Sequence, residues 1–461
     1  MSSSSFKTPT PLEWRDAAIK ALKDRPLEGL VHLDADQLAT RPLYGLANAT
    51  GAVFAPRPSD SEGRSWDVRT INEGGDAAAL NKAILTDLEN GAASVLLSGP
   101  VVRDASSLAT ALEGVALELA PVALDAGFDG VKVGEALDAV AKASPRAKLS
   151  FHLDPISAYA RAGGAPEDFA KIVSEAGTKA AGWSNTYPEA RLFLASGQVA
   201  HEAGASIGQE LAFALSSAVL YVKVLVSAGV STEKALSSVT LGVAVDQEYF
   251  DSLAKIRALR ILWSNVSKAF GHEVQAQIEA RSSRRMLAAR DPWPNMLRLT
   301  AAGFAGAVGG ADIVVLDGFT RAAGLPDDFA RRQARNTQLI LMEESNLGRV
   351  DDPASGSWYL DARTRELAEA AWAEFQAYEA EGGVVGFLET GLLQQRIERA
   401  REFAEKAYTN GAAQIVGVTK FVDPDVRAAP VAAEVSEVKT YGAFAPLVPV
   451  RIAAAFEEAG Q

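Results

Sequence analysis

Cysteine is absent from this sequence of 461 residues. A disulfide scaffold, a cysteine nucleophile, an iron–sulfur cluster and any thiolate-bound metal are therefore excluded. Histidine is also scarce. The four histidines are His32, His152, His201 and His272. No two of them lie within the spacing of a helical turn or a hairpin, so the sequence predicts no histidine metal cage.

Positive charge is in deficit, because 45 Lys and Arg stand against 58 Asp and Glu, for a net charge of −13. This balance argues against general nucleic-acid binding. The first residues lack the apolar core of a secretory signal. The longest apolar stretch, Glu210 to Val230, contains Lys223 and a central Ser216–Ser217 pair. We interpret it as a buried helix rather than a membrane span and expect a cytoplasmic protein.

Residues 1–60 are rich in loop-forming residues and poor in apolar ones. One short helix is predicted over Pro11 to Lys23, with Trp14 on its apolar face. The segment contains too little apolar material to form its own core. We therefore expect residues 1–60 to form an N-terminal arm that lies along another surface.

From about residue 66 short apolar runs alternate with amphipathic stretches. The predicted strands are Ser94–Leu97, Leu119–Leu124, Lys148–Leu153, Leu192–Ala195, Val239–Val245, Val274–Glu279 and Asp312–Leu316. The helices between them include Ala77–Asn90, Val133–Lys142, Glu167–Ala176, Ile207–Ala228 and Gln247–Phe270. Seven or eight such units favour a closed α/β barrel of the (β/α)8 TIM type, with an open doubly wound sheet as the alternative. Neither a GxGxxG nor a GxxxxGK[ST] motif follows any strand.

After Leu316 the pattern becomes mainly helical. Helices are predicted over Asp327–Glu344, Arg363–Glu381 and Gly391–Thr409, one more strand over Ala413–Phe421, and a short helix near Arg451–Glu458. We therefore divide the chain into the arm (1–60), the barrel (61–345) and a C-terminal helical extension with its tail (346–461). No further domain is expected.

Barrel enzymes place their catalytic groups at the carboxyl ends of the strands. The polar residues that follow predicted strands are His152, Asp154, His201, Glu202, Arg281, Arg284, Arg285 and Asp317. We interpret His152 as a hydrogen-bonded barrel residue and the His201–Glu202 pair as helix packing. The arginine cluster is compatible with phosphate binding, with a carboxylate partner or with a solvated loop. These residues contain no complete acid–base or nucleophile–base set, so the pattern alone declares no active site.

One gap-free segment, residues 332–357, changes the interpretation. It reads RQARNTQLILMEESNLGRVDDPASGS. This segment resembles the signature of the methylmalonyl-CoA mutase family, which is R-x-A-R-N-T followed by E-E, a basic residue, D-P and G-S. The matching positions are Arg332, Ala334, Arg335, Asn336, Thr337, Glu343, Glu344, Arg349, Asp352, Pro353, Gly356 and Ser357. The similarity extends over roughly residues 60–421.

The resemblance implies an acyl-CoA-binding barrel from a family that rearranges acyl-CoA thioesters with adenosylcobalamin. Family members that bind this cofactor carry D-x-H-x-x-G in a second, flavodoxin-like domain. The residues two positions before the four histidines here are Leu30, Ser150, Val199 and Phe270. The expectation is that this chain has no such domain and binds no cofactor or metal, and that adenosylcobalamin belongs to a partner subunit.

Two departures from the family pattern concern catalysis. Active members carry W-T-I-R-Q-Y, and the tyrosine position is Ile71 in this chain. They also carry G-Y-H-M-Q-E-A-G, whose catalytic histidine position is Val199, with His201 two residues further on. Apolar side chains cannot donate a hydrogen bond to a developing oxyanion, and losing one donor costs on the order of 10²–10³ in rate. No catalytic residue is therefore expected.

The pattern resembles the small, non-catalytic subunits of heterodimeric family members. The implied function is to support a large catalytic subunit in a complex that interconverts (R)-methylmalonyl-CoA and succinyl-CoA. A mutase-associated GTPase chaperone is a further implied partner, whereas nucleic acid and membrane are not. Vestigial substrate contacts are predicted at Arg64, Arg69, His201 and Arg281. The alternatives are a split mutase barrel that borrows a separate cobalamin protein, and a barrel that binds CoA esters without mutase activity.

Overall fold

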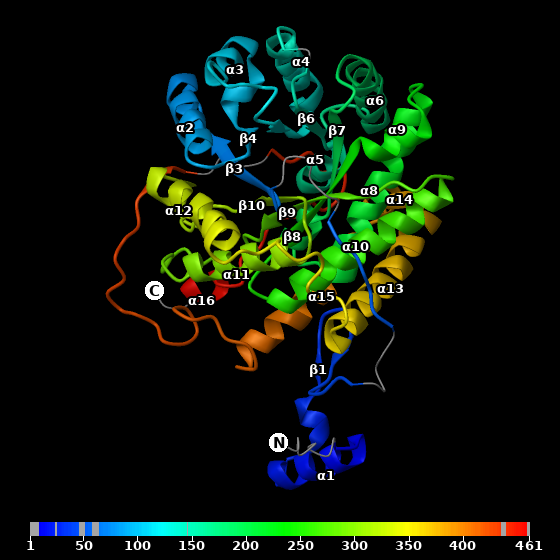
Figure 1. Cartoon of the computed structure of the whole chain (residues 1–461), viewed down its shortest axis with the longest axis vertical. Helices are drawn as coiled ribbons and strands as arrows, with labels where there is room; N and C mark the ends of the chain where they lie inside the picture. The colour runs from blue at the N-terminus through cyan, green and yellow to red at the C-terminus, as the bar shows by residue number, and fades with distance from the viewer. Residues whose placement is uncertain are drawn as a thin grey trace, which may run out of the picture.

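The computed structural model describes residues 9–23, 25–45, 51–57, 64–144, 146–434 and 439–458. Eight parallel strands close into a barrel in the order β10-β3-β4-β5-β6-β7-β8-β9 (Figure 1). The strands are β3 (Asp67–Glu73), β4 (Ser94–Ser98), β5 (Val122–Asp125), β6 (Leu149–Leu153), β7 (Arg191–Ser196), β8 (Val239–Val245), β9 (Gln277–Ser282) and β10 (Ile313–Val315). The predicted (β/α)8 fold is confirmed, and the open sheet is not formed.

Helices form the outer layer of the barrel (Figure 1). They are α2 (Ala77–Glu89), α3 (Ala105–Ala111), α4 (Gly130–Ala141), α6 (Phe169–Thr186), α8 (Ile207–Ser227), α9 (Thr232–Ser237), α10 (Tyr249–Ala269), α11 (Asn295–Val308) and α12 (Asp328–Leu339). Two short helices, α5 (Pro155–Ala162) and α7 (Gln198–Glu202), directly follow β6 and β7. Many begin at a short polar N-cap, such as Asp76 before α2, Asp154 before α5 and Ser206 before α8. These caps satisfy backbone N–H groups of the first helical turn, so the chain enters each helix at a defined residue.

The strand positions follow the apolar runs with small shifts. Strand β8 has the predicted bounds, whereas β5 and β9 each begin three residues later than expected. Strand β3 was not among the predicted strands. It alternates between Val68, which belongs to the outer core, and charged residues such as Arg69 and Glu73, which belong to polar networks. A strand whose inner face is charged has no continuous apolar run, so the pattern that marks parallel strands is missing.

Helix α8 is the one helix in the described part of the chain that is long and apolar enough to cross a membrane. Of its most apolar window, 72% is buried inside the fold. Leu211, Phe213 and Tyr221 belong to the main core, and Phe193 of β7 stacks on Tyr221 with ring centroids 4.4 Å apart. The helix therefore packs as a core element between the barrel and the C-terminal helices, as the sequence predicted.

The C-terminal extension packs on the barrel through α13 (Trp358–Ala380), α14 (Gly383–Glu389) and α15 (Leu392–Thr409). Leu367 and Tyr378 of α13 lie in the same core cluster as the barrel strands. The predicted strand over residues 413–421 was wrong, because this segment contains only one bridge, between Val416 and Lys420. Its backbone turns at Gly417 and Phe421, where φ is 81° and 55°, and left-handed residues cannot continue a strand.

The N-terminal arm contains α1 (Pro11–Leu22), followed by the short hairpin of β1 (His32–Leu33) and β2 (Ala39–Thr40). Helix α1 was predicted over nearly the same residues, and it begins with a capping box formed by Thr10 and Glu13. None of its residues is buried. Figure 1 shows α1 standing away from the barrel, beyond the hairpin.

Candidate functional site

The carboxyl ends of the barrel strands are spanned by an ion pair. Arg281 of β9 and Asp125 of β5 approach to 2.9 Å between Nη1 and Oδ2. In the ring of eight strands β5 and β9 are four places apart in either direction, so this pair joins opposite walls of the barrel. Burial alone would lower the pKa of Arg281, but the carboxylates of Glu279 and Asp125 raise it above its ordinary value. The mouth of the barrel is therefore bridged by a permanently charged pair.

A second ion pair lies beneath this bridge. Arg69 of β3 binds Glu279 of β9 at 2.6 Å and Ser94 at 2.7 Å, with only 2% of its side chain exposed. Burial raises the pKa of Glu279, but Arg281 and Arg69 outweigh that effect and hold the pKa at about 2. Arg69 and Arg281 share Glu279 as partner, so two of the four predicted substrate contacts belong to one ion-pair network. Within the described structure Nη2 of Arg281 has no hydrogen-bond partner.

A separate group of charges borders this network. Arg284 binds Asp317 at 2.9 Å, and Arg321 binds Glu73 at 2.7 Å. Burial would raise the pKa of Asp317, but Arg284 and Arg321 lower it below its ordinary value. Three arginines were compatible with phosphate binding on sequence alone. Two of them, Arg281 and Arg284, are thus paired with carboxylates of the same chain.

His152 lies inside the barrel on β6 and is 4% exposed. Within the described structure neither ring nitrogen has a hydrogen-bond partner, so the interpretation of a hydrogen-bonded histidine was wrong. Its φ of 47° is rare for a residue with a side chain, and the β6–β7 register is irregular between Ser150 and Leu153. Burial lowers the pKa of His152 to about 3, which keeps the imidazole neutral.

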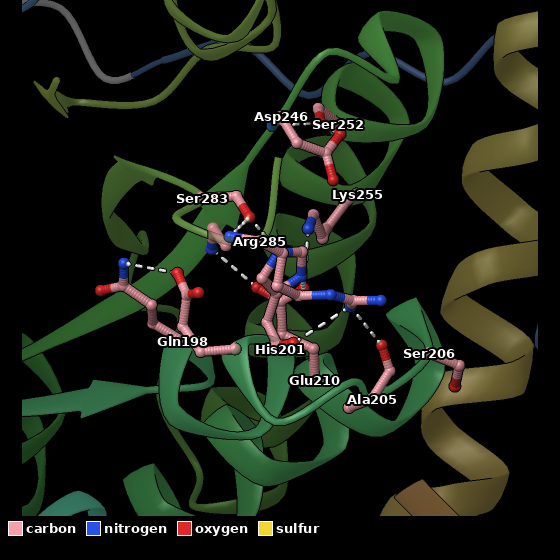
Figure 2. A network of polar contacts seen from close by, with 12 residues as sticks. Gln198, His201, Ala205, Ser206, Glu210, Asp246, Ser252, Lys255, Ser283 and Arg285 are labelled. Carbon is pink, nitrogen blue, oxygen red and sulfur yellow. Dashed lines mark hydrogen bonds and ion pairs between the residues drawn. The ribbon is translucent and has the colours of Figure 1, made fainter. Parts of the chain in front are cut away.

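His201 points into a buried polar network with Glu210 and Ser283 (Figure 2). Its Nδ1 lies 3.2 Å from Oε2 of Glu210, and its Nε2 lies 2.7 Å from Oγ of Ser283. Glu210 also binds Nζ of Lys255 at 2.7 Å and accepts a hydrogen bond from the backbone N–H of Ala244. Arg285 completes the network by donating to the carbonyl of His201.

The order Ser283–His201–Glu210 has the geometry of a serine–histidine–acid triad. Ser283, His201 and Glu210 are 1%, 4% and 0% exposed, so no substrate reaches this serine. Glu210 is moreover shared with Lys255. We interpret the network as a support that fixes α7, α8 and the loop after β9. Sequence reasoning missed Glu210, Lys255 and Ser283; the only signal was a glutamate inside an otherwise apolar helix.

Both family positions that catalysis requires hold apolar side chains. Ile71 packs against the small cluster that contains Leu96 and Val315, and it borders a pocket that Arg69 also lines. Val199 is buried in the main core. Arg64 lies away from the ion-pair network and donates a hydrogen bond to the carbonyl of Gly91. Contact of Arg64, Arg69, His201 or Arg281 with an acyl-CoA stays a prediction.

The C-terminal segment, residues 439–458, crosses the loops at the same end of the barrel, and we call it the strap. Its backbone N–H groups donate to three carbonyls: from Leu447 to Ala160, from Val450 to Glu202 and from Ile452 to Arg285. Those three residues follow β6, β7 and β9, respectively. The strap therefore covers part of the mouth and ends in α16 (Ala454–Glu458).

The described residues offer no side chain suited to bind the lower face of a cobalamin. His152 and His201 are buried, His32 lies in the arm, and His272 follows α10 at the opposite end of the barrel. Within the described ranges no group of three or more histidine, aspartate or glutamate residues could hold a metal ion. Chemistry that needs such a group cannot be derived from this barrel.

Comparison with known proteins agrees with this arrangement. The family model for methylmalonyl-CoA mutase matches residues 92–442. The methylmalonyl-CoA mutase small subunit of Streptomyces virginiae is 39% identical over 402 residues, covering 84% of this chain and 65% of the relative. The probable small subunit of Mycobacterium bovis is 38% identical over 448 residues, covering 92% and 71%. The small subunit of Propionibacterium freudenreichii subsp. shermanii is 35% identical over 366 residues, covering 77% and 57%.

This chain thus spans between 57% and 71% of the length of these relatives. The family model covers most of the barrel and the C-terminal extension, from before β4 to the start of the strap. Fold, motif and comparison lead to the same assignment: the chain belongs to the methylmalonyl-CoA mutase family.

Proposed function

We propose that this chain is the small, non-catalytic subunit of an adenosylcobalamin-dependent methylmalonyl-CoA mutase. The complex interconverts (R)-methylmalonyl-CoA and succinyl-CoA, and the large subunit holds the cofactor and performs the turnover. The small subunit supports the large one through a permanent one-to-one contact in the cytoplasm. A GTPase chaperone that acts on the complex belongs to the same proposal.

The observation that carries this proposal is the bridge between Arg281 and Asp125 across the barrel mouth. A substrate that entered along the axis would have to break a charged pair whose arginine is also bound to buried Glu279. Displacing Asp125 from this half-exposed pair costs less than about 1 kcal/mol, whereas breaking the buried pair of Arg69 and Glu279 costs several kcal/mol. The family's two catalytic positions are moreover Ile71 and Val199, whose side chains have no hydrogen to donate to an oxyanion.

The relatives add support from their names, because three of them are called small subunits of methylmalonyl-CoA mutase. A small subunit implies a larger partner. The arm offers this chain a surface for such a partner, since α1 has no buried residue and exposes Leu12 and Ile19. Permanent complexes bury on the order of 2,000–5,000 Å², and an extended arm contributes area to such an interface.

Turnover of a reconstituted complex tests this proposal. We expect Ile71→Ala and Val199→Ala in this chain to leave methylmalonyl-CoA isomerisation within about twofold of wild type, because less than about 0.5 kcal/mol of barrier is involved. The matched control is substitution of the histidine in the G-Y-H-M-Q-E-A-G motif of the large subunit, which should abolish turnover. A loss beyond about tenfold, or about 1.4 kcal/mol, from Ile71→Ala with the complex intact would favour a working, split-mutase barrel instead.

A further inference from the structure

Helix α1 has few means of stability in the isolated chain. It has 12 residues, a capping box and a proline in its first turn, but no buried residue. Isolated helices of about this length are marginal in water. Leu12 and Ile19 are 67% and 45% exposed. Under the proposed function, on which this inference rests, α1 is covered by the large subunit. The orientation of α1 toward that subunit then depends on how the hairpin that follows α1 is attached to the rest of the chain.

The first fixed point at the base is Asp36, in the turn of the arm hairpin. One carboxylate oxygen accepts a hydrogen bond from the backbone N–H of Gly208 at 3.0 Å, and the other accepts from the hydroxyl of Ser206. Both donors belong to the N-terminal turn of α8, where a carboxylate is stabilised by the helix dipole. A Cβ on residue 208 would lie 2.7 Å from Asp36 Oδ1, so a larger residue there would force this carboxylate to move.

The second fixed point is Asp34, two residues earlier. One of its oxygens accepts from the backbone N–H of Leu38 at 2.9 Å and thereby closes the hairpin turn. The other binds the guanidinium of Arg363 on α13, which is 1% exposed and also binds Asp251 of α10 at 2.7 Å. Burial would lower the pKa of Arg363, but Asp251 and Asp34 raise it, so the arginine stays charged.

Asp34 and Asp36 therefore reach two different helices, α13 and α8, from one short turn. Two attachment points fix the direction of a rigid hairpin, whereas one would leave it free to rotate. We propose that this anchor of Asp34 and Asp36 on Arg363 and Gly208 sets the direction of the arm, and so presents α1 to the large subunit in one orientation. The four are positioning residues. Their effect on affinity comes from preorganisation, because an arm already held in its bound direction loses less entropy on binding.

The arm direction can be measured directly, because the chain contains no cysteine and accepts spin labels at chosen sites. Labels at Lys20→Cys on α1 and Glu398→Cys on α15 report the distance between arm and body; both positions are exposed. We expect a narrow distance distribution in the labelled parent and a broad one after Asp36→Ala or Gly208→Ala. Glu28→Ala, an exposed arm position outside the anchor, is the matched control and should leave the distribution narrow.

Affinity for the purified large subunit is the second readout. We expect Asp36→Ala and Gly208→Ala to weaken binding about tenfold, which corresponds to about 1.4 kcal/mol, with Glu28→Ala unchanged. Gly208→Ala separates positioning from folding, because alanine in a helical turn has the higher helix propensity. A merely structural role therefore predicts an equal or higher melting temperature and unchanged affinity for this variant.

The possible results separate the two levels of the proposal. Broad distances with weakened binding support the anchor. Distances that stay narrow in both variants, or affinities equal to wild type, overturn the anchor while leaving the proposed subunit function standing. A wild-type chain that ignores the large subunit and pairs only with a second copy of itself overturns both.

Discussion

The barrel mouth and the N-terminal arm differ in whether their side chains find partners within the chain. At the mouth Arg281 and Arg69 both bind the buried carboxylate of Glu279, so their charges are balanced within the chain. In the arm, α1 buries nothing and presents Leu12 and Ile19 to solvent. The contrast supports the proposal that this chain interacts through its arm rather than through the mouth of its barrel.

The largest effect is expected from removing Glu279, the carboxylate that Arg69 and Arg281 share at the barrel mouth. Glu279→Gln removes the buried carboxylate that Arg69 and Arg281 share and leaves them only Asp67 and Asp125 as carboxylate partners. We expect a loss of about 3 kcal/mol in the free energy of unfolding. Denaturant titration measures this loss. The matched control, Glu135→Gln, breaks a half-exposed pair with Lys179 and should cost less than about 1 kcal/mol. Equal effects of the two variants would mean that the mouth network is not a structural lock.

Removing the arm tests the other side of the comparison. Deletion of residues 1–45 should weaken binding to the large subunit by at least about 100-fold, or about 2.7 kcal/mol, because the exposed face of α1 is lost. Circular dichroism should still show a folded barrel, since the main core consists of residues after the arm, apart from partly buried Leu38 packed against it. A truncated chain that binds as tightly as the full one would contradict the proposed partner role of the arm.

Removing the ion pair of Asp125 and Arg281, with the buried Arg69–Glu279 pair left intact, should have a smaller effect on the free energy of unfolding. Asp125 is half-exposed, so Asp125→Asn removes a pair that water partly screens, and we expect a loss of less than about 1 kcal/mol in stability. We also expect no mutase turnover from the isolated variant, because Ile71 and Val199 remain apolar. If the isolated Asp125→Asn chain, supplied with adenosylcobalamin, catalysed the isomerisation, the ion pair of Asp125 and Arg281 alone would be what prevents turnover in this barrel.

The pH dependence should differ between the two regions. Glu279 has its pKa lowered to about 2, so its stabilising contribution is present above its ordinary value of 4.5 and is lost as the pH falls toward 2. Burial of Asp36 outweighs its hydrogen bonds from Ser206 and Gly208 and raises its pKa to about 6 against an ordinary 3.8. Its contribution is therefore present at low pH and is lost as the pH rises through 6. Asp34 and Arg363 face this group, with opposite effects on its pKa.

The spin-label distance between arm and body should therefore narrow slightly from pH 7 to pH 5, while the melting temperature of the barrel is not lowered by its carboxylates in that range. A distribution that broadens on acidification would contradict the assignment to Asp36. Asp36→Ala, which removes the titrating group, should abolish the pH effect and serves as the control.

Local chemistry carried much of the fold prediction. The apolar periodicity of α1, α2 and α8 predicts these helices within a few residues of their observed bounds. Strand β3 could not be predicted in this way, because Arg69 and Glu73 on its inner face break the apolar run. The strand predicted over residues 413–421 is not formed, although the segment is apolar, because its backbone turns at Gly417 and Phe421.

The sequence by itself determined the family, through the motif at residues 332–357, and the loss of polar groups at Ile71 and Val199. Only the tertiary structure decided which charges pair. Asp125 and Arg281 are 156 residues apart and meet because closure of the barrel places β5 opposite β9. His201 could have faced a ligand on spacing alone, yet α7 directs it toward Glu210 and Ser283. The family motif and the secondary structure depend on residues that are close in sequence. Whether a charged side chain is paired depends on which distant residue of opposite charge the fold brings within about 3 Å.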